Sequence, residues 1–257
     1  MITSQQLAEL SKKFKTNKTV VFREYLQLLF LQNLYQAKGS ETILFKGGTA
    51  IHFIFNSFRF SEDLDFICDI PEKKFEKLFS NAILAMKTVC PEISLRKKKA
   101  LIGKSYLIRY EGDLLEFPVF VSLDFSFREK PLTREKTILT TEFPVVFSSF
   151  VYHLSGEEIL AEKIRAIIIR AKGRDFFDLW YLLSRGARIN WSWVRKKMSY
   201  YSEVHWDKKR VLGKLSAYSF ESFQKDIKPF VGFDKREKLS ELFELVKRKI
   251  NSEIKSS

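Results

Sequence analysis

The sequence predicts an α+β fold with a mixed sheet in residues 1–154, followed by a helical domain in residues 155–257. One observation is that short alternating segments, separated by glycine and proline, lie among helical patterns before residue 155. A second is the capping-box sequence Ser155-Gly156-Glu157-Glu158, after which the composition is helical to the C-terminus. A third is the content of 45% hydrophobic and 15% aromatic residues, which is typical of a globular chain with a buried core.

The spacing of apolar residues predicts the individual elements. Helices are expected at residues 4–15, 18–37, 50–55 and 71–90. Strands are expected at residues 42–45, 63–69, 93–98, 104–110 and 119–127, with two more possible between 136 and 154. In the second half, Gly173 is expected to break the helix that Ser155 caps, and a final helix is expected at 234–254.

Composition narrows the class of protein. The 45 basic and 31 acidic residues give a net charge of +14, which favours a polyanionic partner such as RNA, although lysine-rich surfaces are also simply soluble. Two cysteines are too few for a disulfide framework or a zinc cluster. No signal peptide and no apolar run of about 18 residues is recognisable, so we expect a cytoplasmic protein without a membrane partner.

The pair Asp63 and Asp65 is the first candidate for chemistry. Residues two apart in a strand project from the same face, so both carboxylates are expected side by side. Two such charges held together are costly unless a cation compensates them. Oxygen ligands of this kind select Mg²⁺ or Mn²⁺ rather than zinc, so the pair predicts a divalent-metal site.

A third carboxylate, Asp124, lies in the alternating segment Ser122–Phe127. Three carboxylates on adjacent strands can hold two metal ions for an in-line phosphoryl displacement. Asp124 is therefore expected either to bind metal or to act as the general base for an attacking hydroxyl. The alternative, which alternation alone leaves equally open, is an aspartate on a solvated strand face.

Gly47 and Gly48 stand between a predicted strand and a predicted helix, followed by Thr49. Glycines let a backbone approach a phosphate closely, and the amide groups at a helix start attract anions. Thr49 is expected to contact the phosphate or to cap the helix. Taken alone, Gly-Gly-Thr favours a plain strand-to-helix turn, and its combination with the aspartate strands is what makes a nucleotide site specific.

Four segments together resemble the AbiEii/MenT-type nucleotidyltransferases, which are toxins of type IV toxin–antitoxin and abortive-infection systems. These are Lys46–Ala50, Arg59–Phe66, Glu162-Lys163 and Arg174–Leu179. The matching motifs span residues 46–179, and the ends of the chain show no matching motif. The resemblance implies a polymerase-β-like core in residues 1–154, with the helical domain contributing to the active-site cleft.

The resemblance also implies roles for particular residues. Ser61, together with the Lys46–Thr49 segment, is expected at the nucleotide phosphates, and Asp63 and Asp65 at the metal. Lys163 matches a lysine that contacts nucleotide phosphates, and Asp175 an aspartate near the same pocket. The implied reaction transfers a nucleotide from a nucleoside triphosphate to RNA, with the tRNA 3′ end as acceptor, and so inhibits translation. A cognate antitoxin is the implied partner.

Several alternatives remain open from the residues themselves. Asp175 could interact only with its helix dipole, and Asp178 could pair with Arg165 or Arg174. The Trp- and Lys-rich segment 191–210 could bind RNA through stacked rings and cations, or its aromatic residues could form core. For function, the alternatives are transfer to a small-molecule or protein hydroxyl, and a non-catalytic RNA- or partner-binding module on the same fold.

Overall fold

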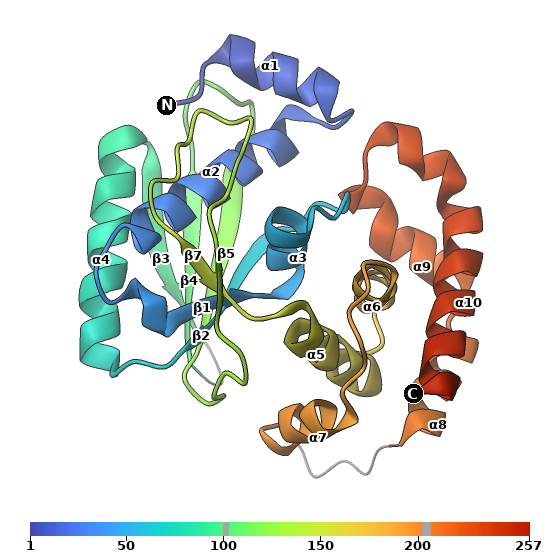
Figure 1. Cartoon of the computed structure of the whole chain (residues 1–257). Helices are drawn as coiled ribbons and strands as arrows, with labels where there is room; N and C mark the ends of the chain where they lie inside the picture. The colour runs from blue at the N-terminus through green and yellow to red at the C-terminus, as the bar shows by residue number, and fades with distance from the viewer. Residues whose placement is uncertain (100–102, 202–206) are drawn as a thin grey trace. The chain divides into compact units, whose positions relative to one another are not determined.

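The computed structural model describes residues 1–99, 103–201 and 207–257, and the chain forms two compact units (Figure 1). The first unit comprises residues 1–54 and 60–154, and the second comprises residues 55–59 and 155–257. The first contains the sheet and the second is helical, so the predicted α+β class with a helical C-terminal region is confirmed. The chain enters the helical unit for five residues, 55–59, before it returns to the sheet.

A seven-stranded mixed sheet forms the centre of the first unit, with the order β3-β4-β5-β2-β1-β7-β6 among the described residues. β2 pairs in parallel with β5, and β1 with β7, while the other neighbours are antiparallel. The strands are β1 (Ile43–Lys46), β2 (Asp63–Cys68), β3 (Ile93–Lys98), β4 (Lys104–Tyr110), β5 (Val119–Ser126), β6 (Glu135–Thr137) and β7 (Val151–His153). Both additional strands anticipated between 136 and 154 are thus present, with β6 beginning one residue earlier.

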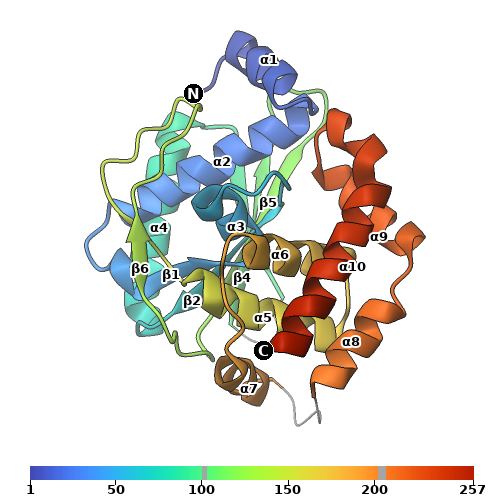
Figure 2. The ribbon, with the colours of Figure 1, turned by 45° about the vertical axis from the view of Figure 1, so that its right-hand side comes forward.

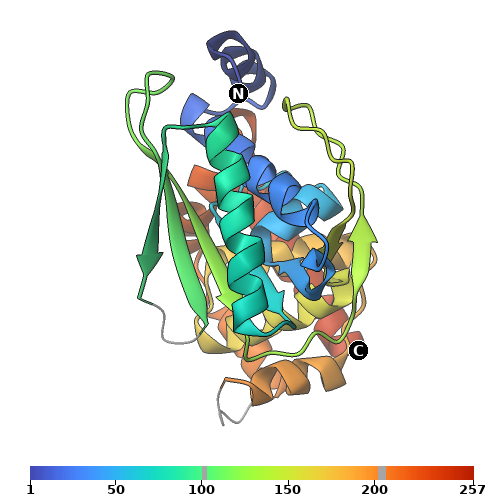
Figure 3. The same ribbon diagram turned by 90° about the vertical axis from the view of Figure 1, so that its left-hand side faces the viewer.

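Helices α1 (Ser4–Lys13), α2 (Lys18–Tyr35) and α4 (Glu72–Val89) also belong to this unit. α2 and α4 lie side by side against one face of the sheet (Figure 3). Phe66 of β2 and Phe125 of β5 stack there with ring centroids 4.8 Å apart, and Phe30 of α2 and Phe79 of α4 close over them. This aromatic core covers one face, and alternation along β2 and β5 turns their polar residues to the other.

Helix α3 (Gly47–Phe55) begins at Gly47, immediately after β1 ends at Lys46. The prediction of a helix starting at residue 50 was therefore three residues late. Gly47 has φ +79°, a conformation that glycine adopts without steric cost, and this allows the strand to turn directly into the helix. The two glycines consequently lie in the first helical turn, where backbone amide groups lack helical acceptors.

The second unit is helical in its described residues (Figure 2). Its α-helices are α5 (Gly156–Ile169), α6 (Gly173–Ser184), α7 (Trp191–Ser199), α8 (Lys208–Ser216), α9 (Phe220–Ile227) and α10 (Leu239–Ser256). Ser155 caps α5 as predicted, accepting a hydrogen bond of 3.2 Å from the Glu158 amide. The last helix starts later than residue 234, because residues 233–238 form a 3-10 helix before it.

Gly173 opens α6 as well as separating it from α5. A Cβ at this position would lie 2.9 Å from the Asp226 Cβ, and the Gly173 amide donates a hydrogen bond of 2.6 Å to the Asp226 carboxylate. Close packing on α9 therefore explains this glycine. None of the helices within the described residues is long and apolar enough to cross a membrane.

Candidate active site

Strand pairing in the first unit places the predicted acidic residues in neighbouring positions. Asp65 of β2 is paired with Asp124 of β5 on one side and with Lys46 of β1 on the other. Ser105 of β4 is paired in turn with Asp124. Directly paired residues project from the same face, and neighbouring strands lie about 4.8 Å apart. The sheet therefore carries a row of Lys46, Asp65, Asp124 and Ser105 on the face opposite the aromatic core.

Asp63 extends this row along β2. It is paired with Ser122 of β5, two residues before Asp124, so all three aspartates share one face of two adjacent parallel strands. Each of the three is half-buried. Lys98, at the end of β3, donates a hydrogen bond of 3.1 Å to the Ser122 hydroxyl. Alternation along β2 predicted the pair of Asp63 and Asp65, and the register of β2 and β5 places Asp124 beside them. The sequence alone did not specify that register.

Gly47 and Asp65 approach each other so closely that no other residue fits in place of the glycine. A Cβ on Gly47 would lie 2.2 Å from the Asp65 Oδ2 and 2.9 Å from its Cγ. The start of α3 is therefore directly beside an acidic side chain of the sheet. Gly48 follows in the same turn and is buried. The predicted strand–Gly-Gly–helix arrangement places backbone amide groups and a carboxylate at one point.

Thr49 and Ser61 are tied to the loop that leads into β2. Thr49 is fully buried, and its hydroxyl donates a hydrogen bond of 2.5 Å to the Asp63 carbonyl oxygen. Gln27 of α2, also fully buried, donates from its side-chain amide to the carbonyl oxygens of Ser61 (3.0 Å) and Glu62 (2.9 Å). Both side chains fix the backbone from which Ser61 and Asp63 project. Sequence reasoning missed Gln27, whose signal was a lone amide within an apolar helix face.

Lys46 is buried and forms an ion pair of 3.2 Å with Glu129, whose side chain is fully buried. A buried charge is stable only when it is paired and hydrogen-bonded. The ion pair therefore explains why both Lys46 and Glu129 can be buried here. Glu129 follows β5 in sequence and lies near Lys46 because β5, β2 and β1 are neighbours. No local sequence pattern indicates this pairing.

The oxygen atoms that the first unit offers are of the chemical type that binds a divalent cation. Asp63, Asp65 and Asp124 supply carboxylate oxygens from one face, and Ser61 and Ser122 add hydroxyl oxygens nearby in the chain and the sheet. Such hard oxygen donors match Mg²⁺ or Mn²⁺. Within the described part of the chain, however, no group of three or more His, Cys, Asp or Glu side chains is gathered closely enough to form a metal site.

The other predicted site residues, Lys163 of α5 and Asp175 of α6, lie in the helical unit. The Lys163 Nζ is 2.7 Å from the Asp178 Oδ2 and 3.6 Å from the Asp175 Oδ1. Asp175 is fully buried and also accepts two hydrogen bonds of 2.9 Å from the Arg170 guanidinium. Asp175 is therefore part of a buried ion-pair cluster, and helix-dipole interaction alone does not describe it.

The pKa of Asp175 reflects two opposing effects. Burial by itself would raise its pKa, because it disfavours the charged form. The hydrogen bonds from Arg170 and the charges of Lys163, Arg170 and Arg59 outweigh this, so that the pKa of Asp175 is lowered. The carboxylate therefore stays ionised, and it can hold the Lys163 ammonium group by charge attraction.

Asp178 pairs with Arg59 and Lys163, and the alternatives of Arg165 and Arg174 were wrong. The Arg59 Nε and Nη2 donate hydrogen bonds of 2.8 and 2.9 Å to the two Asp178 carboxylate oxygens. The guanidinium of Arg165 lies over the Tyr201 ring, at 3.9 Å from its centroid, and that of Arg174 lies over Phe230 at 4.8 Å. Cation–π packing thus accounts for both arginines.

A further buried charge cluster was missed by sequence reasoning. Lys197 of α7 is fully buried, and its Nζ lies 2.7 Å from Glu158 and 3.0 Å from Glu162, both on α5. Glu162 immediately precedes Lys163, so α7 fixes the helix that carries the predicted phosphate-binding lysine. The only sequence signal was the Glu158/Glu162 spacing of four, which places two acids on one helix face.

The Trp- and Lys-rich segment 191–210 divides into different environments. Trp191 and Trp193 are half-buried, while Arg195 and Lys196 are exposed. The Trp191 indole donates a hydrogen bond of 3.0 Å to Ser257, so this ring is held by the C-terminus. His205 and Trp206, which the RNA-binding hypothesis also included, lie outside the described residues.

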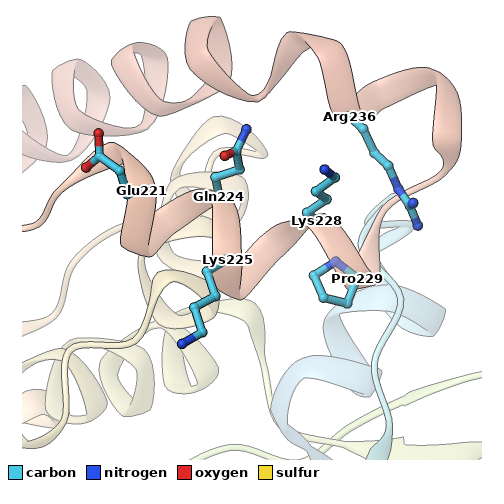
Figure 4. Close-up of a pocket in the computed structure, with 6 residues that line it drawn as sticks. All are labelled: Glu221, Gln224, Lys225, Lys228, Pro229 and Arg236. Atoms are coloured by element: carbon cyan, nitrogen blue, oxygen red, sulfur yellow. The ribbon is translucent and has the colours of Figure 1, made fainter.

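A pocket of 360 Å³ lies elsewhere in the helical unit, between α9 and the 3-10 helices that follow it (Figure 4). It is lined by Glu221, Gln224, Lys225, Lys228, Pro229 and Arg236. None of these lining residues was predicted as a site residue. The lining thus carries three cations and one carboxylate.

Comparison with solved structures identifies the same architecture in known proteins. MenT4, a nucleotidyltransferase toxin from Mycobacterium tuberculosis, matches with a TM-score of 0.64 and 20% identity over 97% of this chain and 89% of that chain. JHP933 from Helicobacter pylori matches with a TM-score of 0.57 and 19% identity over 93% of this chain and 94% of that chain. At these identities the likeness establishes the fold. A comparison with curated proteins gave no match.

A family model provides the assignment that the structures alone do not. The model described as the nucleotidyl transferase AbiEii toxin of type IV toxin–antitoxin systems matches residues 29–249. That range includes the glycine turn, the three aspartates, Lys163 and Asp175, and it extends beyond the motifs at residues 46–179. The chain is an enzyme of nucleotidyl transfer, and it belongs to the AbiEii nucleotidyl transferase toxin family of type IV toxin–antitoxin systems.

Proposed function

We propose that this protein transfers a nucleotide from a nucleoside triphosphate to the 3′ end of tRNA, in a reaction that depends on Mg²⁺ or Mn²⁺, and thereby inhibits translation. The observation that carries this proposal is the register of β2 and β5. Asp63, Asp65 and Asp124 project from one face of two paired strands, with the start of α3 beside Asp65. Family membership supports nucleotidyl transfer and an antitoxin partner, and the metal and the acceptor are our inferences.

Each proposed site residue of the first unit has a distinct role in this reaction. Asp63, Asp65 and Asp124 would hold the divalent cations, which supply charge stabilisation for the attacking and leaving oxygens when bound. The amide groups of Gly47 and Gly48, at the start of α3, are suited to the triphosphate because they lie at the positive end of the helix dipole. Ser61 can donate its hydroxyl to a phosphate oxygen.

Asp124 is additionally suited to accept the proton of the attacking 3′-hydroxyl. It is the one of the three acids that lies on β5, whereas Asp63 and Asp65 lie on the neighbouring β2. A carboxylate there can position a hydroxyl by hydrogen bonding and accept its proton as the hydroxyl oxygen bonds to the α-phosphorus. The bond between the α- and β-phosphates then breaks, and pyrophosphate leaves. Lys163 is proposed to contact the nucleotide phosphates, as the family motif implies, and Asp175 to hold its ammonium group in place.

The proposed acceptor rests on charge and on chemistry. The net charge of +14 favours association with a polyanion, and RNA carries both the phosphates and the 3′-hydroxyl that the reaction requires. A modified tRNA 3′ end cannot be aminoacylated, which would block translation in the cytoplasm. The cognate antitoxin is proposed to prevent this damage.

Incubation of the full chain with each labelled nucleoside triphosphate and total tRNA tests the proposal. We expect label on tRNA with at least one nucleotide, loss of transfer on removal of divalent cations by EDTA, and recovery on addition of Mg²⁺ or Mn²⁺. Asp63→Ala should abolish labelling while the protein remains folded. Unchanged labelling by Asp63→Ala, or no transfer with any nucleotide, would refute the proposed site or reaction.

The same experiment separates the alternative acceptors. Label that appears on a protein or a small molecule in a cell extract, with none on RNA, would retain the site and replace the acceptor. Periodate oxidation of the tRNA 3′ end should abolish labelling if the terminal hydroxyl is the nucleophile. Labelling that survives this oxidation would place the modification elsewhere on the RNA.

A further inference from the structure

The connection between α3 and β2 is packed into the helical unit, although Ile54 before it and Phe60 after it belong to the sheet unit. Phe58 meets the Phe177 ring edge-on with centroids 5.1 Å apart. The Tyr181 hydroxyl donates to the carbonyl oxygens of Phe55 (2.9 Å) and Asn56 (2.6 Å). Residues 55–59 therefore belong to the helical unit, although in the sequence they lie between the Gly47-Gly48 turn and Asp63.

Arg59 ends this segment and is almost completely buried, at 2% exposure. Its Nε and Nη2 bind the two oxygens of Asp178, which is also buried, in a fork-like pair with distances of 2.8 and 2.9 Å. Two parallel hydrogen bonds fix the plane of the carboxylate as well as its position. The Arg59 guanidinium thus holds the Asp178 carboxylate through both of its oxygens.

Asp178 links Arg59 to Lys163. Its Oδ2, which accepts from the Arg59 Nη2, is also 2.7 Å from the Lys163 Nζ. Asp175 lies 3.6 Å from the same ammonium group and is itself held by Arg170. Lys163, with 11% of its side chain exposed, therefore sits between two carboxylates, each of which an arginine orients. Charges alternate along the series Arg59, Asp178, Lys163, Asp175 and Arg170.

We propose that Arg59 is a positioning residue that acts through Asp178 to hold the Lys163 ammonium group in its working place. This inference rests on the proposed function in so far as Lys163 contacts the nucleotide. Arg59 reaches this cluster only because residues 55–59 fold with the helical unit. The same segment continues towards β2 and reaches Asp63 four residues later, so one short stretch of chain carries both Arg59 and the first of the three aspartates.

Lysine cannot replace arginine in this role. Arg59→Lys keeps the positive charge but presents a single point of contact, so the Asp178 carboxylate is free to rotate and its hold on Lys163 weakens. Arg174→Lys is the matched control, because Arg174 packs over Phe230 and takes no part in the cluster. Asp178→Asn is a second variant, which retains the size of the side chain and removes the charge that holds Lys163.

Two measurements on the full chain test the proposal. The first is the rate at which an amine-reactive reagent acylates Lys163, followed by mass spectrometry of its peptide, which is distinct from that of residue 59. Arg59→Lys and Asp178→Asn should each raise this rate about fivefold or more, as expected for loss of a charge-assisted hydrogen bond. Arg174→Lys should leave it unchanged. An unchanged rate in both Arg59→Lys and Asp178→Asn would overturn the inference, whether or not the protein transfers nucleotides.

The second measurement is the kinetics of transfer, with the KM for nucleotide and for acceptor determined separately. Arg59→Lys should raise the nucleotide KM about fivefold or more and leave the acceptor KM unchanged, because a displaced Lys163 weakens the phosphate contact. In a Lys163→Ala background, Arg59→Lys should add no further effect. Independent, multiplying effects would overturn the inference. Absence of transfer by the unaltered protein would instead refute the proposed function, and the acylation result would still decide the role of Arg59.

Discussion

The sheet unit and the helical unit hold their functional charges differently. In the sheet unit, Asp63, Asp65 and Asp124 are half-buried and derive their proximity from strand pairing. In the helical unit, Asp175 and Asp178 are buried, and each carboxylate is bound by an arginine and a lysine. The first arrangement gathers like charges at a solvent-accessible face, and the second balances opposite charges out of solvent.

The two arrangements of charge differ in how readily they can change. Like charges that share one accessible face are stabilised by a cation or by hydrogen-bond donors, which agrees with the exchangeable ligands that we propose for the sheet. A balanced buried cluster resists rearrangement, because removal of one member leaves an uncompensated charge. The helical unit is therefore suited to holding one side chain, Lys163, in a fixed place. Perturbations of the two units should differ in kind as well as in size.

Gly47→Ala should have the largest effect on activity. The new Cβ would overlap the Asp65 carboxylate, at 2.2 Å from its Oδ2, and alanine would also be strained at φ +79°. We expect displacement of Asp65 and a loss of transfer rate of about 100-fold or more, because a misplacement of about 1 Å costs that much. The backbone strain adds about 1–2 kcal/mol of destabilisation. Transfer assays and urea denaturation measure the two effects.

Gly213→Ala is the control for this substitution. Gly213 lies within α8, and a Cβ there would meet no heavy atom within 4 Å. Since alanine is a better helix former by about 0.8–1.0 kcal/mol, this variant should be as stable as the unaltered protein or more so, with unchanged activity. Equal losses in both glycine variants would show that Gly47 has no special relation to Asp65.

Lys197→Met should have the largest effect on stability in the helical unit. It removes the Lys197 charge that pairs with the buried Glu158 and Glu162, and breaking such a cluster costs about 3–5 kcal/mol. The neighbouring Lys196 is exposed, so Lys196→Met should change the free energy of unfolding by no more than about 0.5 kcal/mol. Urea denaturation of the two variants compares them directly. Similar values would contradict a structural role for the buried cluster.

Asp175→Asn should have a smaller effect that depends on pH. The lowered pKa of Asp175 means that the unfolded chain binds its proton more readily than the folded one. The stabilisation is therefore fully present above the unfolded value of about 3.9 and is lost as pH falls through the folded pKa. At neutral pH we expect a loss of about 1.5–3 kcal/mol for hydrogen bonds to a charged group, since Arg170, with 56% of its side chain exposed, can remain solvated.

The measurement for Asp175→Asn is urea denaturation at neutral pH and in steps towards about pH 3.5. The difference in stability between the unaltered protein and the variant should be constant at neutral pH and shrink below about pH 4. A difference that grows as the pH falls would have the wrong sign for a carboxylate with a lowered pKa. Such a result would mean that the ion pairs with Lys163 and Arg170 do not form in solution.

The features that could be predicted from the sequence are those with local patterns. Alternation in β2 and β5 placed Asp63, Asp65 and Asp124 on strand faces, and the capping sequence at Ser155 marked the start of α5. The start of α3 was predicted too late, because a glycine with positive φ allows a strand to pass into a helix without a loop. Local periodicity carries no information about such a direct junction.

Features that depend on distant contacts could not be predicted. Arg59 and Asp178 are 119 residues apart, and Lys197 and Glu162 are 35 apart, so neither pair leaves a spacing signal. The register that pairs Asp65 with Asp124 likewise requires the strand order of the whole sheet. The sequence therefore indicated which residues were chemically suited to the site, and the fold determined which of them are neighbours.

Asp69→Asn should have the smallest effect, and it separates charge pairing from burial. Asp69 follows β2 and binds Lys130, with Nζ 2.7 Å from Oδ1, and Arg134, and hydrogen bonding from Lys130 is the main reason why its pKa is lowered. It thus has two cationic partners, as Asp175 does.

The Lys130 and Arg134 side chains are 71% and 46% exposed, however, and water and salt screen such pairs. We expect a loss of about 0.2–1 kcal/mol at low salt, declining at high salt, whereas the loss in Asp175→Asn should persist. A salt-independent loss as large as that of Asp175→Asn would show that pairing, rather than burial, sets the cost of removing a charge in this protein.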